Sequence, residues 1–276
     1  MGVSGHQSGF ASLHVGYVQG ASAVVGCRSG TPLSLLTPRS RGSSVWAYTS
    51  SFGGGMVAGD EIKIDLKVDA GAMCFLGSQA SNKIYRNPRC LPCTHRLSAS
   101  LAEGSLLVLA PDPVQCFADA SYDQQQIFHL APDANLVLVD WVSAGRLSRG
   151  ERWSFNRYAS RNEIFHGERR SLVDAIHLDT RAVPLTNRFG VGRFNCFATV
   201  AILGPLVNSH AQELLARIAS EPIAPGSSLL VSVSPIRDGA ILRVAGMSIE
   251  EVGHALYKNL GFVSTLLKDD PWLRKW

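Results

Sequence analysis

The clearest pattern in this chain is a strict alternation of apolar and polar residues in one short stretch. Four apolar residues alternate there with three charged ones: Ile62, Lys63, Ile64, Asp65, Leu66, Lys67 and Val68. A period of two is typical of a strand that buries one face and exposes the other. A turn at residues 69–71 and an apolar run from Ala72 to Leu76 follow, so we predict a pair of strands here.

The combination of a turn and an apolar strand recurs along the chain. It is found in DAGAMCFL, AEGSLLVL and PDANLVLV, whose strands open at Ala72, Ser105 and Asn135. The spacings are 33 residues (72 to 105) and 30 residues (105 to 135). Such a period predicts stacked β layers, each of which buries the face of its neighbour. An ordinary β-sandwich built from hairpins would produce a similar pattern.

The two ends of the chain differ from this pattern. Residues 1–12 are rich in glycine and serine, so we expect a flexible N-terminus followed by one β domain over 13–276. In the C-terminal third, apolar spacing predicts a helix over 208–219. Ser248 and Glu251 form a capping box that opens an apolar stripe, so a second helix of about five turns should follow. We expect a loop at 32–44 and separate strands at 153–158 and 162–166.

Composition narrows the class of protein. The chain has 276 residues, of which 46% are hydrophobic and 17% charged, values typical of a globular protein. No signal peptide is recognisable and no apolar run is long enough to span a bilayer, so we expect a cytoplasmic protein with its six cysteines reduced. The net charge of +4 is spread without a dense basic run, so it gives only weak support for nucleic-acid binding, and we favour arginine pairs at protein interfaces.

The glycine run at 53–55 precedes two adjacent carboxylates. No Gly-Lys-Ser/Thr follows the glycines, and Asp60 and Glu61 would repel phosphate, so a phosphate loop is excluded. Adjacent strand residues point to opposite faces, so these two side chains cannot both face one buried ion unless the strand starts after them. Their carboxylates would suit a route for a divalent cation, and the alternative is a solvated strand end.

The segment Cys90-x-x-Cys93-x-His95 is an incomplete metal-binding pattern. A structural zinc ion needs four ligands, and Cys74 or Cys116 could supply the fourth. A structural metal, a transient metal contact and ordinary loop thiols therefore all remain open for this cluster.

A second charged motif lies between two predicted strands. It begins at Asp140, carries Arg146 and Arg149 in a glycine-punctuated loop, and ends with Glu151 before Trp153. Such a loop forms either a surface ion-pair network or a contact with a partner.

Taken in order, these motifs resemble those of one family. The segments GGG-x-x-x-GDE, SQASNKIYR, PDPVQCF and DW-x-x-x-GR-x-x-RGE-x-W are similar to the signatures of the UreD (UreH) family of urease accessory proteins, across residues 10–276. The resemblance implies stacked, helically wound β-sheets with two α-helices in the C-terminal third. It also implies a non-enzymatic chaperone that assists nickel insertion into apo-urease with a UreF-type protein and, through it, a UreG-type GTPase. No cofactor would be tightly bound, nickel would bind transiently, and neither nucleic acid nor membrane would be a partner.

The resemblance also assigns roles to individual residues. The candidates for a metal path are Asp60, Glu61, Ser78, Gln79, Asp140 and Glu151. The candidates for structure or partner contact are Lys83, Tyr85, Arg146 and Arg149. The Cys90, Cys93 and His95 cluster has no counterpart in the general pattern. Two other functions remain: a cytosolic metal-dependent hydrolase using Asp60, Asp140 and the late histidines, and a zinc-stapled β interaction module.

Overall fold

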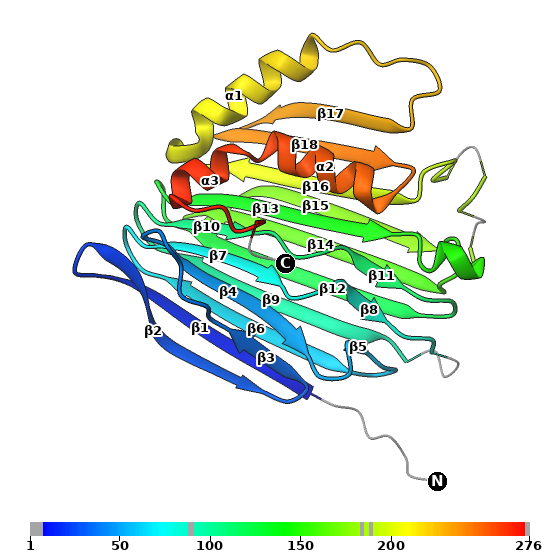
Figure 1. The fold of residues 1–276 in the computed structure, drawn as a ribbon, viewed down its shortest axis with the longest axis horizontal. Helices are drawn as coiled ribbons and strands as arrows, with labels where there is room; N and C mark the ends of the chain where they lie inside the picture. The colour runs from blue at the N-terminus through cyan, green and yellow to red at the C-terminus, as the bar shows by residue number, and fades with distance from the viewer. Residues whose placement is uncertain (1–7, 88–90, 183–184, 188–189, 274–276) are drawn as a thin grey trace.

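The computed structural model describes residues 8–87, 91–182, 185–187 and 190–273. Within these residues the strands form two facing β-sheets, and helices cover the outer side of one of them (Figure 1). Three α-helices and one short 3₁₀ helix lie in the described ranges: α1 (Pro205–Ala219), α2 (Ile249–Asn259), α3 (Phe262–Leu267) and η1 (Leu147–Arg149). None of the described helices is long and apolar enough to cross a membrane.

The two sheets of the described chain have seven and eleven strands. The first sheet runs in the order β15 (Arg169–Asp179), β14 (Arg157–His166), β12 (Ser121–Leu130), β9 (Cys93–Leu101), β6 (Glu61–Val68), β1 (Ser8–Val18) and β2 (Ala21–Gly30). The second runs β17 (Leu229–Ile236), β18 (Gly239–Gly246), β16 (Cys196–Leu203), β13 (Asn135–Ser143), β10 (Leu106–Leu109), β7 (Met73–Ser78), β4 (Val45–Ser51) and β3 (Leu33–Leu36). The short strands β5 (Gly55–Met56), β8 (Asn82–Ile84) and β11 (Val114–Cys116) join the second sheet beside β13.

The repeated turns stack on one another, as their spacing predicts. The chain passes from the first sheet to the second at each turn, and β10 pairs in parallel with both β7 and β13. The backbone of Gly71 donates to Glu103 O at 2.9 Å, and the backbone of Asn135 donates to Ser105 O at 2.8 Å. In this register Leu106 pairs with Asn135, whereas the sequence motifs align Ser105 with Asn135. The step from β10 to β13 is therefore one residue shorter than the motif spacing of 30 residues. The predicted helically wound β-sheets are confirmed.

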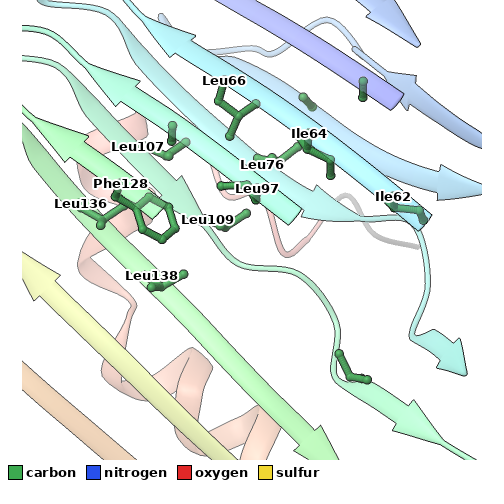
Figure 2. Packing of buried hydrophobic residues seen from close by; sticks show 14 of the residues in the cluster. Ile62, Ile64, Leu66, Leu76, Leu97, Leu107, Leu109, Phe128, Leu136 and Leu138 are labelled. Atoms are coloured by element: carbon green, nitrogen blue, oxygen red, sulfur yellow. The ribbon is translucent and has the colours of Figure 1, made fainter. Parts of the chain in front are cut away.

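The main hydrophobic core lies between the sheets. Figure 2 shows the inward-facing side chains of β6, β7, β9, β10, β12 and β13 gathered there: Ile62, Ile64, Leu66, Leu76, Leu97, Leu107, Leu109, Phe128, Leu136 and Leu138. A second core lies between the second sheet and the helices, where Val108 and Val137 pack with Val207 and Val252. Strands buried on both faces read as continuous apolar runs, which explains LLVL in β10 and NLVLV in β13.

Three predicted boundaries were wrong. Strand β1 begins at Ser8, so residues 8–12 pair with β6 instead of forming a flexible end, while residues 1–7 lie outside the described residues. The predicted loop at 32–44 contains β3, because Leu33 and Leu35 are buried and the strand pairs with β4. The predicted strands at 153–158 and 162–166 are a single strand, β14, preceded by a connection whose Trp153 packs into the core.

The long C-terminal helix was also predicted wrongly, although its apolar stripe was read correctly. The capping box is present, since the Ser248 hydroxyl accepts a hydrogen bond from the backbone of Glu251 at 3.1 Å. The helix breaks at Leu260 and Gly261, which separate α2 from α3. Glycine is a poor helix former, and the break still leaves Leu260 and Leu267 buried against the second sheet.

Candidate functional site

A layer of polar side chains interrupts the core between the two sheets. Strand β12 places Tyr122, Phe128 and Leu130 in the interior. The two inward-facing positions between Tyr122 and Phe128 are occupied by Gln124 and Gln126. We call the following residues the interior polar layer: His95 on β9, Gln124 and Gln126 on β12, Asp140 on β13, and Ser160 and Asn162 on β14. The register aligns them, because Gln124 is level with His95 and Ser160, and Gln126 is level with Asn162.

Asp140 is the centre of this layer. Its Oδ1 atom accepts a hydrogen bond from Gln124 Nε2 at 3.1 Å. Its Oδ2 atom accepts bonds from Ser160 Oγ at 2.5 Å and Asn162 Nδ2 at 2.8 Å. Burial raises the pKa of Asp140, and these three hydrogen bonds act in the opposite direction. Every partner described for this carboxylate is neutral, so its charge is not balanced by a cationic side chain among the described residues.

A first cavity of about 180 Å³ lies on one side of Asp140. Its wall combines apolar side chains of β6 and β9 with polar ones that include His95, Ser78, Asp112 and Asp140. The lining extends to exposed residues at 79 and 80, so the cavity reaches the surface at the end of β7. A cavity of this size with polar groups on part of its wall holds several water molecules or a hydrated ion.

A second cavity of about 570 Å³ lies on the other side of the layer. Asp174 on β15, Thr199 on β16 and Arg243 on β18 supply its charged and hydroxyl groups. Asp174 is level with Asn162 of the first sheet, and Thr199 is level with both Asp140 and Arg243 of the second. Arg243 Nη2 lies 3.3 Å from Asp174 Oδ1. Polar residues therefore occupy paired positions on neighbouring strands all the way from the first cavity to the second.

Three of the predicted path residues lie together. Ser78, Gln79 and Asp140 all line the first cavity. The Ser78 hydroxyl accepts a hydrogen bond from the backbone of Asp112 at 2.8 Å, and Gln79 Oε1 accepts one from Ser50 Oγ at 2.6 Å. These contacts set the side chains at the surface end of the cavity.

The carboxylates before β6 lie apart from this group. Asp60 is buried, and its Oδ2 atom accepts a hydrogen bond from the backbone of Val57 at 2.9 Å. Glu61 points to the other face, where it lies 3.4 Å from Lys63 Nζ with 41% of its side chain exposed. The expectation that these neighbours face opposite sides is confirmed.

The charged loop after β13 forms its own network. Arg146 pairs with Glu151 and stacks over the Phe117 ring, 4.1 Å from its centroid. The side-chain hydrogen bond from Arg146 lowers the pKa of Glu151, which also accepts a bond from the backbone of Ala118 at 3.2 Å. Arg149 lies in the 3₁₀ helix η1 and is exposed. Glu151 therefore closes the loop and does not join the interior polar layer.

Lys83 and Tyr85 lie at the same end of the molecule as this loop. Lys83 is level with Gly55 of β5 and Gln115 of β11 in the backbone register. The Tyr85 hydroxyl donates a hydrogen bond to Gly53 O at 2.9 Å, and its ring meets the edge of Phe117. Both residues hold neighbouring loops together.

The cysteine and histidine cluster is divided by the fold. Cys90 lies outside the described residues. Cys93 is buried, and its thiol donates a hydrogen bond to Val57 O at 3.0 Å. Burial, together with the charge of Asp60, raises the pKa of Cys93 to about 11, and burial lowers the pKa of His95 to about 4. No group of three or more metal-binding side chains is found among the described residues, and the described cysteines are free.

The sequence reasoning missed most of the interior polar layer. Gln124, Gln126, Ser160 and Asn162 were not singled out, and neither were the groups of the second cavity, Asp174, Thr199 and Arg243. A signal was available in β12, where two glutamines occupy inward positions between Tyr122 and Phe128. A polar residue at an inward position of a long strand needs a buried partner, and here the partner is Asp140.

These features define a two-sheet β-solenoid whose interior polar layer separates two cavities. A family model described as UreD urease accessory protein matches residues 7–276, so the chain belongs to this family and the resemblance of its motifs is confirmed. The chain is 46% identical over 247 residues to the Urease accessory protein UreD of Sorangium cellulosum, covering 89% of this chain and 77% of that protein. It is 42% identical over 272 residues to the Urease accessory protein UreD of an Anaeromyxobacter species (98% and 90%). It is 30% identical over 290 aligned residues to the Urease accessory protein D of Oryza sativa subsp. indica (95% and 94%).

Proposed function

We propose that this protein assists urease maturation by guiding nickel through its interior to apo-urease. The observation that carries the proposal is the position of Asp140, a buried carboxylate between the two cavities. All the described hydrogen-bond partners of this carboxylate are neutral. A negative group without a cationic partner is costly inside a protein, and a passing cation would offset that cost. Nickel is the cargo in this proposal and does not stay as a cofactor.

The donors along the interior suit transfer better than storage. Between the cavities the chain offers hydroxyl, amide and carboxylate oxygens at Ser160, Asn162 and Asp140. Such groups replace part of the hydration shell of a divalent ion, and too few of them converge on one point to trap it. The absence of any cluster of three strong ligands in the described ranges fits this requirement.

In this proposal the protein is a scaffold and catalyses no reaction of its own. A UreF-type protein would bind it, and a UreG-type GTPase would join through that partner and deliver the nickel. The sequence carries no phosphate-binding loop, which agrees with GTP hydrolysis belonging to a partner. Apo-urease would then receive the metal from the far end of the interior.

The two alternative functions receive less support. A metal-dependent hydrolase built on Asp60 and Asp140 would need both carboxylates at one ion, but the described lining of the cavity that contains Asp140 does not include Asp60. A zinc-stapled module would need several ligands around Cys93, whereas this thiol donates to a backbone carbonyl and no group of three or more metal-binding side chains is found among the described residues.

The substitution Asp140→Asn tests the proposed function. It removes the charge from the interior and keeps the size of the side chain. The variant is produced together with urease and the other accessory proteins, and the nickel content of purified urease is measured by mass spectrometry. We expect several-fold less nickel in urease, with unchanged co-purification of the partners. Asp65→Asn is the matched control, because Asp65 is exposed on the outer face of β6 and should leave the nickel content unchanged. Full nickel loading with Asp140→Asn would remove the interior route.

A further inference from the structure

His95 places an imidazole in the wall of the first cavity, at an inward position of β9. It lies on the inner face of β9 between Cys93 and Leu97, which are both buried. Its side chain is part of the cavity wall together with Asp140. Among the described residues that line this cavity, His95 is the only imidazole, and the other titratable groups are the carboxylates of Asp112 and Asp140.

One ring nitrogen of this half-buried imidazole lacks the hydrogen bond that a buried nitrogen normally makes. Its Nδ1 atom is buried and has no hydrogen-bond partner in the described part of the chain. The residue beside it in the register, Gln124, uses its side chain for Tyr122, Asp140 and Ser160. A buried polar atom without a partner destabilises the fold, so such an atom needs an explanation.

Ligand chemistry supplies that explanation. The rest of the polar wall consists of hydroxyl, amide and carboxylate groups. Their oxygens coordinate Mg²⁺ and Ca²⁺ as readily as transition metals. Imidazole nitrogen binds Ni²⁺, Zn²⁺ and Cu²⁺ but contributes little to the binding of Mg²⁺ or Ca²⁺. One nitrogen donor beside these few oxygens, in a wall that is otherwise largely apolar, therefore changes which cations the cavity prefers.

We propose that His95 is the specificity-determining residue of the first cavity and gives it a preference for late first-row divalent ions over Mg²⁺ and Ca²⁺. The proposal rests on the proposed function only in placing this cavity on the nickel route. A single nitrogen with scattered oxygen donors binds weakly, which agrees with a temporary stop and with the absence of a closed ligand cluster in the described ranges. His95 would thus select the cation, and Asp140 would attract it onward.

The test compares binding of Ni²⁺ alone with binding of Mg²⁺ alone to the full-length chain. The variant is His95→Gln, and the matched control is His129→Gln, because His129 is exposed on the outer face of the same sheet. Titration calorimetry gives both affinities, and ¹⁵N NMR of the histidine rings shows which resonance paramagnetic Ni²⁺ broadens. We expect Ni²⁺ binding to weaken on the order of tenfold in His95→Gln while Mg²⁺ binding is unchanged. The control should match the wild type.

A second variant keeps the test informative if His95→Gln folds poorly. His95→Cys supplies another ligand for late transition metals and should restore the preference for Ni²⁺. Equal affinities of wild type and His95→Gln for Ni²⁺, or a parallel loss of Ni²⁺ and Mg²⁺ binding, would overturn the assignment and leave His95 with a packing role beside water. The outcome is separate from the proposed function, because Asp140→Asn reports on nickel in urease and His95→Gln reports on metal preference in this chain.

Discussion

Asn162 Nδ2 lies 2.8 Å from Asp140 Oδ2, so an amide of the first sheet and a carboxylate of the second are joined across the interior. The residues are 22 positions apart in sequence and lie on β14 and β13. Without this contact, each side chain would lose a hydrogen bond inside the protein, which would destabilise the fold. Together with Gln124 and Ser160 they form a network in which both carboxylate oxygens of Asp140 accept hydrogen bonds.

The first prediction concerns the pH dependence of stability. Burial raises the pKa of Asp140 above its value in the unfolded chain, so the folded state holds this proton more tightly. The contribution of Asp140 to stability is therefore complete at pH values below the unfolded pKa and is lost as the pH rises through the folded-state pKa. Each tenfold increase in proton affinity corresponds to about 1.4 kcal/mol. We expect the stability of Asp140→Asn relative to wild type to rise as the pH rises above about 4, the pKa of an aspartate in an unfolded chain.

Urea unfolding across this pH range measures the difference. The amide of the variant does not titrate, and any loss of hydrogen bonds shifts its stability by an amount that does not depend on pH. The slope of the difference is therefore the informative quantity. A difference that stays constant, or that favours the wild type as pH rises, would contradict a raised pKa for Asp140.

The second prediction separates Asp60 from Glu61. The structure gives these two neighbouring carboxylates different surroundings. Asp60→Ala removes a buried acceptor for the backbone of Val57 and should cost about 1–2 kcal/mol of unfolding free energy. Glu61→Ala removes only a surface pair with Lys63 and should change stability by less than about 0.5 kcal/mol. Parallel urea titrations at pH 7 compare the two, and a loss below about 0.5 kcal/mol for Asp60→Ala would show that its buried hydrogen bond contributes little.

The third prediction concerns the thiol of Cys93. Burial raises the pKa of Cys93 to about 11, so a metal ion that bound this thiol would first have to displace its proton. Cys93→Ser keeps a donor for Val57 O and should leave the metal content of the purified protein and the nickel content of urease unchanged. Its stability should fall by on the order of 1 kcal/mol, since a hydroxyl is more costly to bury than a thiol. Cys27→Ser is the control, because Cys27 is exposed. Loss of a bound metal in Cys93→Ser alone would instead establish Cys93 as a ligand.

Local patterns were sufficient for much of the fold. The alternation from Ile62 to Val68 determined which side of β6 faces the core, because successive side chains on a strand point to opposite faces. The repeated turns predicted the stacked coils, since a turn of similar length returns each strand pair onto the previous one. The signature motifs identified the family. All of these signals lie within a few residues of one another, so the sequence displays them directly.

The interior site was decided by the tertiary structure. Gln124, Asp140 and Asn162 come from three strands and two sheets, and no local pattern shows that their side chains meet. Their meeting depends on the parallel register of β9, β12 and β14, which the lengths of whole coils determine. The same register divided the predicted residues, bringing His95 and Asp140 to one cavity wall and leaving Asp60 and Glu151 outside it. The order of residues along the chain thus determined the strands, and the stacking of the coils determined which polar groups share the interior.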